Sequence, residues 1–276
     1  PLHAELLPQR VLLTTDWQIQ FDDALKPEAN YLQQQLQQQG IQLRLASHDA
    51  SAKQLIRLST TPELELAAEG YQLTISEQQI SLNGKDSSGA FYAIQSLLAL
   101  QHNSSKGLTL PAGKITDQPR AGWRGMHYDM ARNFHGKAVT LRLIDNMARY
   151  KLNKLHLHLT EDEGWRLQIP GLPELTDIGA TRCFDLSEQK CLLTQLGTGP
   201  DANGSGNGYY TTADFIEILR YATARHIEVI PEIDLPGHAR AAIIAMKVRY
   251  NRLMAEGNAE EATHYLLSDP DDTSVY

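Results

Sequence analysis

The segment from Lys154 to Trp165, K-L-H-L-H-L-T-E-D-E-G-W, restricts the fold more than any other part of the chain. Leucines alternate with polar residues from Lys154 to Thr160, and this period of two predicts a strand with one apolar and one polar face. Three acids, Glu161 to Glu163, follow directly. Because parallel α/β sheets and β/α barrels hold their ligands at the carboxyl ends of the strands, this end is the predicted active face.

Strands and helices alternate in the part of the chain after residue 118, and this order is typical of parallel βαβ units. A closed (β/α)8 barrel needs eight such units and about 250 residues, whereas 156 residues follow Arg120 in this chain of 276. The predicted fold class is therefore α/β, with residues 119–276 as the first, N-terminal portion of a (β/α)8 TIM barrel in a longer chain. The expected elements are strands at 125–130, 154–160 and 227–233, and helices at 139–152, 211–225 and about 238–256.

Residues 1–118 are predicted to form a smaller α/β domain that precedes the barrel. One helix has Pro27 near its start and Gly40 just past its end, the usual placement of these residues at helix termini. The sequence of this domain gathers no acids, bases or nucleophiles, so we expect it to support the barrel structurally. Its expected strands are 41–46, 54–58, 71–75 and 79–83, and its expected helices are 27–39 and 88–101.

The charge of the chain restricts its partners. The formal net charge is −8 at pH 7, whereas nucleic acids and anionic membranes select basic patches, which no stretch of this sequence supplies. No run approaches the 18 or so apolar residues of a membrane-spanning helix. We therefore expect a neutral partner, no nucleic acid and no membrane span.

Cys183 and Cys191 lie eight positions apart in a polar segment, without a second pair to complete a zinc site. They can form a disulfide or remain two reduced thiols. The disulfide is favoured, and it would place the protein in an oxidising compartment, as an exported protein that is periplasmic, secreted or associated with the outer membrane.

Polar residues occur at the ends of all three predicted barrel strands. Arg124 opens the first strand, Asp162 and Glu163 follow the second, and Asp234 and His238 follow the third. Singly they could be a surface ion-pair partner, a solvated turn and a helix cap. Together they favour a catalytic site, because barrel catalytic residues come from the ends of several strands. An arginine suits hydrogen bonds to neighbouring hydroxyls, and the two aspartates could orient an imidazole.

His156 and His158 also allow a metal-binding interpretation, since both project from one face of the predicted strand. A barrel interior is packed with side chains, and a neutral, hydrogen-bonded histidine is its commoner occupant. We therefore expect no metal at these positions.

Three long segments resemble the successive motifs of glycoside hydrolase family 20, and most closely its bacterial chitobiase-like β-N-acetylhexosaminidases. They are W-R-G-M-H-Y-D-M-A-R-N-F at 123–134, Y-K-L-N-K-L-H-L-H-L-T-E-D-E-G-W-R at 150–166, and V-I-P-E-I-D-L-P-G-H at 229–238. The likeness extends over nearly the whole chain, including the smaller domain before the barrel.

The resemblance implies hydrolysis of terminal, non-reducing N-acetylhexosamine from oligosaccharides. In this family the 2-acetamido oxygen of the sugar attacks the anomeric carbon, so the protein supplies an acid and an orienting carboxylate but no nucleophile. By resemblance, Arg124 would bind hydroxyls of the non-reducing sugar, and Asp162 and His238 would belong to the polar network behind the catalytic acid. Asp234 would support His238, and no cofactor is required.

The resemblance also implies an adjacent Asp-Glu pair in an H-x-G-G-D-E motif after the fourth strand, and these 276 residues contain no such motif. We therefore expect this chain alone to be inactive and to need the remaining part of the barrel. Two alternatives stay open: a non-catalytic carbohydrate-binding homologue, and a family relative that acts on a different linkage.

Overall fold

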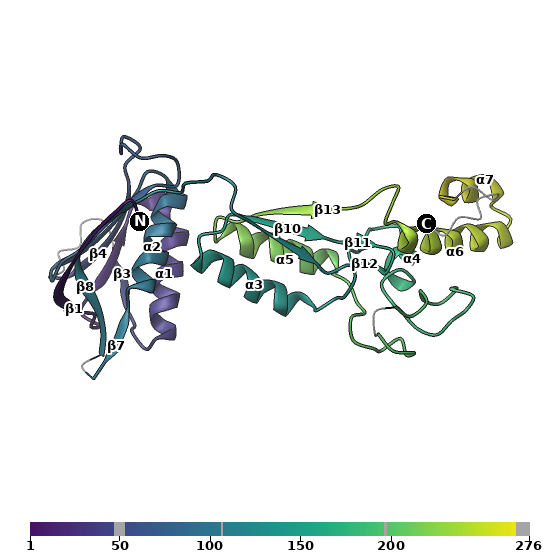
Figure 1. The fold of residues 1–276 in the computed structure, drawn as a ribbon, viewed down its shortest axis with the longest axis horizontal. Helices are drawn as coiled ribbons and strands as arrows, with labels where there is room; N and C mark the ends of the chain where they lie inside the picture. The colour runs from purple at the N-terminus through teal and green to yellow at the C-terminus, as the bar shows by residue number, and fades with distance from the viewer. Residues whose placement is uncertain (47–52, 106, 196–197, 269–276) are drawn as a thin grey trace. The chain divides into compact units, whose positions relative to one another are not determined.

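The computed structural model describes residues 1–46, 53–105, 107–195 and 198–268. These residues form two compact units (Figure 1). The main segment of the first unit ends close to the boundary predicted after residue 118. The first unit comprises Pro1–Arg124, Ala148–Leu152 and Ala224–His226, and the second comprises Gly125–Met147, Asn153–Thr223 and the described residues from Ile227 onward.

The first unit is built on one eight-stranded sheet, with α1 (Lys26–Gln38) and α2 (Ser87–Ala99) in contact with it (Figure 1). The strands run in the order β1-β8-β5-β6-β4-β2-β3, and β7 pairs with β8. Asp86 caps α2 by accepting a hydrogen bond from the Gly89 amide. The strands are β1 (His3–Leu12), β2 (Gln18–Phe21), β3 (Arg44–Ala46), β4 (Leu55–Thr60), β5 (Tyr71–Ile75), β6 (Gln79–Gly84), β7 (His102–Ser104) and β8 (Gly107–Asp117).

Sequence reasoning found β3 to β6 and both helices but missed β1, β2, β7 and β8. The omission of β1 has a clear physical cause. All its side chains except that of Val11 are exposed, so its sequence carries no apolar alternation. Its position is fixed by antiparallel pairing with β8, about a hundred residues away, and no local pattern records that pairing.

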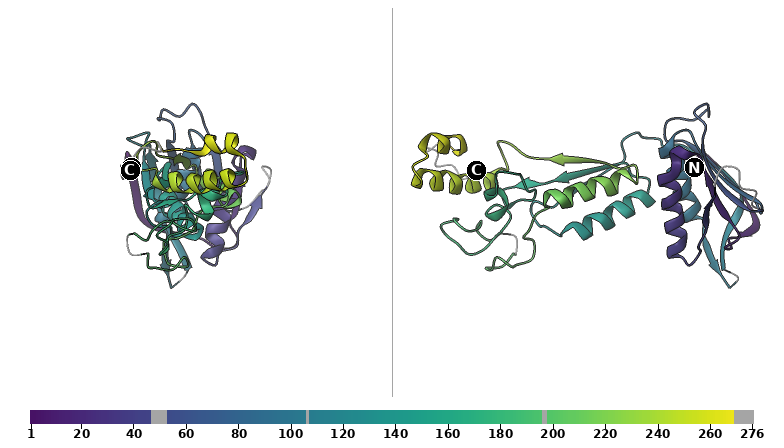
Figure 2. Two further views of the ribbon diagram at one scale, coloured as in Figure 1. Left: turned by 90° about the vertical axis from the view of Figure 1, so that its right-hand side faces the viewer. Right: turned by 180° about the vertical axis from the view of Figure 1, so that it is seen from behind.

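The second unit contains a parallel sheet with the strand order β13-β10-β9. Its strands are β9 (Gly125–Asp129), β10 (Lys154–His158) and β13 (Glu228–Glu232). Helices α3 (Lys137–Arg149) and α5 (Thr212–Thr223) run along the same side of this sheet (Figures 1 and 2). Leu155 and Leu157 of β10 are fully buried, whereas His156 is partly exposed. The two-faced strand predicted from the sequence is therefore confirmed.

The segment after β10 differs from the prediction. The strand predicted over 154–160 ends at His158, and the chain turns into a short hairpin of β11 (Thr160–Glu161) and β12 (Gly164–Trp165). An irregular segment with α4 (Glu174–Asp177) follows, and α6 (Arg240–Ala255) comes after β13. The chain then forms α7 (Ala259–Ala262) and a 3-10 turn at Thr263–Tyr265. Another 3-10 turn, Asp23–Leu25, precedes α1 in the first unit. None of the helices in the described ranges has both the length and the apolar character needed to cross a membrane.

A buried carboxylate joins α4 to α6. Glu174 accepts hydrogen bonds from Arg249 (2.9 Å) and Arg252 (3.0 Å), and its residue is only 9% exposed. Burial alone would raise the pKa of Glu174, but hydrogen bonds from its own backbone amide and from the two arginines outweigh burial and hold that pKa below its usual range. The charged form of Glu174 therefore stabilises the fold.

Glu174→Gln is expected to lower the free energy of unfolding at pH 7 by about 1–3 kcal/mol, the range for hydrogen bonds to charged groups. Because the pKa of Glu174 is lower in the folded than in the unfolded chain, its contribution is present above about pH 4.3 and is lost as the pH falls through the folded value. Urea unfolding at pH 7 and pH 3.5 tests this. Glu256→Gln, which removes an exposed partner of Arg252, should change stability by less than about 0.5 kcal/mol. Equal losses in both variants, or a Glu174→Gln loss that is undiminished at pH 3.5, would contradict the assignment.

Candidate active site

Glu161 is the centre of a polar cluster at the carboxyl ends of the parallel strands. Its side chain is 3% exposed, and its Oε2 lies 2.9 Å from Nδ1 of His238. Its other oxygen, Oε1, lies 3.1 Å from Nε2 of His158 and also accepts a hydrogen bond from the guanidinium of Arg132. A buried carboxylate with this many donors is held in one orientation, and it can in turn orient the imidazole of His238.

The β11–β12 hairpin fixes the place of Glu161. Glu161 pairs with Gly164, where a Cβ atom would lie 2.3 Å from the guanidinium of Arg166, so the close approach requires glycine. Arg166 is fully buried and donates to the Ala131 carbonyl from Nε (3.0 Å) and Nη2 (2.8 Å). These bonds tie the hairpin to the segment after β9 and so bring Arg132 beside Glu161.

Asp162 lies near Glu161 and His238, with ligand atoms of the three residues within 4.8 Å of one another, but its carboxylate is hydrogen-bonded elsewhere. Its carboxylate accepts a hydrogen bond from the backbone amide of Arg240 (3.1 Å), at the first turn of α6. The hairpin turns Glu161 inward and leaves Asp162 beside the helix start, so Glu161 is the acid that contacts His238. Sequence reasoning named Asp162 and overlooked Glu161, because the choice between two adjacent acids depends on where the strand ends.

His238 and Asp234 both lie in the connection between β13 and α6. The His238 side chain is 58% exposed, so one edge of its ring contacts Glu161 and the rest faces solvent. The backbone amide of Asp234 donates to Oγ1 of Thr160 (3.0 Å), and its carboxylate lies near His158 and Glu161, with ligand atoms within 4.8 Å of one another. Asp234 therefore anchors the connection at the hairpin. Asp234 was predicted to support His238, but the carboxylate that hydrogen-bonds His238 is that of Glu161.

Arg124 lies at the other end of β9. It immediately precedes the strand, and its side chain contacts Glu69 (2.7 Å), the hydroxyl of Tyr92 (3.0 Å) and the carbonyl of Lys151 (2.7 Å), all within the first unit. A strand of five residues spans roughly 16 Å at about 3.3 Å per residue. Arg124 therefore lies far from the carboxyl ends of the strands, and its geometry fits a structural role in place of the predicted sugar-binding one.

Arg132, which sequence reasoning missed, is the arginine at the carboxyl end of β9. Its guanidinium contacts Glu161 and lies 2.5 Å from Oδ2 of Asp129 at the end of the strand. Burial alone would raise the pKa of Asp129, but the hydrogen bonds from Arg132 outweigh burial and hold that pKa below its usual range. The Arg132 side chain is 42% exposed, so part of its guanidinium can reach a ligand. The sequence signal was present, because Arg132 follows the strand-end aspartate by three residues.

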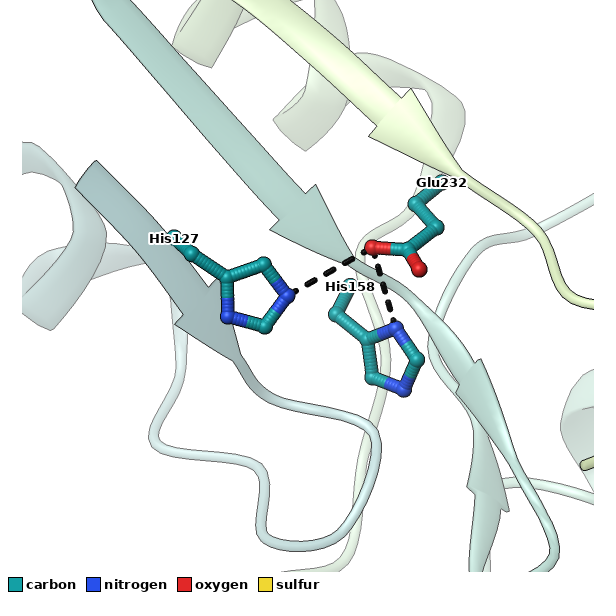
Figure 3. Close-up of side chains that lie close together, drawn as sticks. All are labelled: His127, His158 and Glu232. Atoms are coloured by element: carbon teal, nitrogen blue, oxygen red, sulfur yellow. Dashed lines mark ion pairs between the residues drawn. The ribbon is translucent and has the colours of Figure 1, made fainter. Parts of the chain in front are cut away.

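A second group of polar side chains lies on the face of the sheet that bears His156. Nδ1 of His158 lies 3.1 Å from Oε2 of Glu232, and the same oxygen lies 3.5 Å from Nε2 of His127 and 2.6 Å from Nε2 of His156 (Figure 3). Burial would lower the pKa of His158, but the neighbouring carboxylates of Glu161 and Glu232 outweigh burial and raise that pKa. The side chain of His158 therefore links this group to the cluster around Glu161.

Cys183 and Cys191 form a disulfide, with their Cα atoms 5.7 Å apart, as the favoured interpretation of the sequence predicted. The loop that it closes is connected to the candidate site. Both oxygens of Glu188 lie 2.6 Å from Nη2 of Arg240 at the start of α6, just after His238.

Comparison with known proteins matches both parts of the chain to family models. Residues 122–273 match the model described as "Glycosyl hydrolase family 20, catalytic domain", and residues 1–118 match "Glycosyl hydrolase family 20, domain 2". An N,N'-diacetylchitobiase from Vibrio harveyi is 56% identical over 211 residues, covering 76% of this chain and 24% of that protein. A beta-hexosaminidase B from Pseudoalteromonas piscicida is also 56% identical, over 75% of this chain and 26% of that protein. The chain thus spans about a quarter of the length of these relatives.

Solved structures show the same likeness. A family 20 exo-β-N-acetylglucosaminidase from Vibrio harveyi, in complex with N-acetylglucosamine, matches with a TM-score of 0.79 and 32% identity, over 89% of this chain and 37% of that one. A β-N-acetylhexosaminidase from Streptomyces coelicolor matches with a TM-score of 0.72 and 32% identity, over 88% of this chain and 47% of that one. The fold is accordingly α/β, with the three parallel strands as the first part of a (β/α)8 barrel after a smaller α/β domain.

Proposed function

The chain belongs to glycoside hydrolase family 20, and we propose on that basis that it supplies the first part of a β-N-acetylhexosaminidase. The enzyme would remove terminal, non-reducing N-acetylhexosamine from chitooligosaccharides or glycoconjugates. The proposal rests on the contact between Glu161 and His238 at the carboxyl ends of the parallel strands. The Glu161 side chain is nearly fully buried, and the His238 side chain is largely exposed. Barrel enzymes place catalytic groups at these strand ends. Relatives named for hydrolysis give no support to the alternative of a homologue that only binds carbohydrate.

The proposed reaction is substrate-assisted and retains the anomeric configuration. The 2-acetamido oxygen of the sugar attacks the anomeric carbon while an acid protonates the departing oxygen, and water then opens the resulting cyclic intermediate. His238 would contact the acid and tune it, because its Nδ1 is held by Glu161 while more than half of its side chain is exposed. The reaction requires no cofactor.

Arg132 is the group that we propose to bind the non-reducing sugar, in place of Arg124. Its guanidinium is fixed on one side by Asp129 and Glu161 and is partly exposed on the other. A guanidinium held in this way offers donors in fixed directions, as recognition of neighbouring sugar hydroxyls requires.

We also propose that the protein is exported, since a disulfide persists in the periplasm and outside the cell and is rare in the reducing cytosol. Cell fractionation of the source organism, with an antibody against this chain, tests that location. Recovery of the protein in the cytosolic fraction with both thiols reduced would contradict it.

Residues 1–276 alone are expected not to hydrolyse a chromogenic β-N-acetylglucosaminide. These residues lack the H-x-G-G-D-E motif that holds the catalytic Asp-Glu pair implied by the family resemblance. Loss of a general acid alone lowers the rate roughly 10²- to 10⁴-fold. The measurement compares kcat of this chain with that of the same residues joined to the remainder of a family 20 catalytic domain.

Circular dichroism and a cooperative thermal transition must first show that the shorter chain is folded. Equal turnover by the two proteins would contradict the assignment of the acid to the rest of the domain. Turnover by neither protein, with both folded, would contradict the proposed function itself.

A further inference from the structure

Three strands bring two histidines and a glutamate together on one face of the parallel sheet. His127 comes from β9, His158 from β10 and Glu232 from β13, and Figure 3 shows the three side chains directed toward one another. His158 and Glu232 are direct neighbours in the strand register, and His127 is paired with His156, two residues earlier on β10. Since side chains two residues apart on a strand share a face, this register brings the three groups together.

The distances between the ligand atoms match those of a small metal centre. Oε2 of Glu232 lies 3.1 Å from Nδ1 of His158 and 3.5 Å from Nε2 of His127, and the three atoms all lie within 4.8 Å of one another. In a tetrahedral zinc site with bonds of about 2.0–2.2 Å, neighbouring ligand atoms are about 3.3–3.6 Å apart. Only a small shift of the imidazoles would be needed to admit an ion.

Two of these atoms lack hydrogen bonds. Nδ1 of His158 and Oε2 of Glu232 are buried and make no hydrogen bond with any described residue, although they lie only 3.1 Å apart. A carboxylate can only accept, so in the neutral form of His158, which is the form that binds a metal, Nε2 carries the proton donated to Glu161. In the neutral ring Nδ1 is then an acceptor that faces another acceptor, and a cation between them would satisfy both.

The surroundings of His158 are those of a metal ligand. A histidine that binds metal through one ring nitrogen usually donates its other N–H to a carboxylate, as His158 does to Glu161. The side chain of His127 is 53% exposed in the chain of residues 1–276, so an ion can reach the position in that chain. Two imidazoles and one carboxylate suit zinc and neighbouring transition metals, and leave one coordination position open.

We propose that His127, His158 and Glu232 bind one divalent transition-metal ion of the zinc class. The sequence analysis expected no metal because it considered only His156 and His158. In the structure, His158 lies beside His127 and Glu232, which come from the two neighbouring strands. The proposed glycosidase reaction needs no metal, and the test of this metal site needs no turnover. His156 lies 2.6 Å from Oε2 of Glu232, too close for a fellow ligand in this arrangement, and acts as a neighbour to the site.

The test titrates the chain of residues 1–276, freed of metal with a chelator, with Co²⁺ followed by visible absorption and with Zn²⁺ followed by calorimetry. We expect one ion per chain and the d–d bands of a four- or five-coordinate cobalt centre. His127→Asn should weaken binding by more than 100-fold, since it removes a ligand. Glu161→Gln should weaken binding by about 10- to 100-fold, because it removes only the carboxylate that orients His158.

His264→Asn is the matched control, because His264 is an exposed histidine elsewhere in the same unit, and it should leave the affinity unchanged. His127→Gln is a second variant in case His127→Asn does not fold, as judged by circular dichroism. The absence of saturable binding to the folded wild-type chain would overturn the proposal. Binding that survives both His127 substitutions, or that is lost in His264→Asn, would overturn it equally.

Discussion

Glu161→Gln, in a protein that joins these residues to the remainder of the catalytic domain, is expected to lower kcat by about 10- to 10³-fold. Loss of a group that orients a catalytic residue, or of a single catalytic hydrogen-bond donor, has effects in this range. Glutamine keeps the size of the side chain but removes the charge beside Nδ1 of His238, 2.9 Å away. Steady-state kinetics over a range of pH provide the measurement.

His238→Ala is expected to lower kcat by a similar factor, and the double variant should be scarcely worse than either single one, because residues that act as a unit are not additive. Asp162→Asn is the matched control: it alters an adjacent acid that contacts the backbone of Arg240, and should change kcat by less than about threefold. If Asp162→Asn lowered kcat as much as Glu161→Gln, the choice between the two acids would be wrong. If His238→Ala kept the wild-type kcat, the histidine would be structural.

Arg132→Ala is expected to raise KM and to lower kcat/KM by about 10- to 100-fold, as the loss of a charged hydrogen bond of about 1.5–3 kcal/mol requires. The cause is loss of donors to the sugar hydroxyls in both the ground state and the transition state. Because Arg132 also contacts Asp129 and Glu161, Arg132→Lys serves as a second variant. It keeps the positive charge but loses the planar arrangement of donors, so KM should remain raised.

Arg124→Ala is the matched control for Arg132. Its side chain contacts Glu69, Tyr92 and the Lys151 backbone, so its loss should lower the thermal transition and leave KM unchanged. A raised KM in folded Arg124→Ala, with a normal KM in Arg132→Ala, would restore the role that the family resemblance gave to Arg124.

The features that the sequence predicted well are those recorded in local patterns. The alternation of leucines along Lys154–Thr160 identified β10 and its buried face, which Leu155 and Leu157 confirm. The fold class followed from the alternation of strands and helices, the family followed from three long motifs, and both are confirmed. The pairing of Cys183 with Cys191 followed from their short spacing.

The features that the sequence did not reveal depend on where an element ends. The position of the β11–β12 hairpin decides that the Glu161 carboxylate, and not that of the adjacent Asp162, hydrogen-bonds His238. Arg124 and Arg132 both flank β9, but only the direction of the strand places Arg132 at the active end. The role of Glu232 beside the histidines was overlooked because His158 and His127 lie on two other strands of the sheet, far away in the sequence.

The central claim is that these residues serve a hexosaminidase in which the acetamide of the substrate takes part in the reaction. The most direct measurement is kcat/KM of the chain joined to a complete catalytic domain, on two aryl glycosides that differ only at carbon 2: the β-N-acetylglucosaminide and the β-glucoside. We expect turnover of the first, and a rate on the second at least about 10³-fold lower, because the glucoside lacks the oxygen that attacks the anomeric carbon. Comparable rates on both glycosides would contradict substrate assistance and, with it, this account of the site.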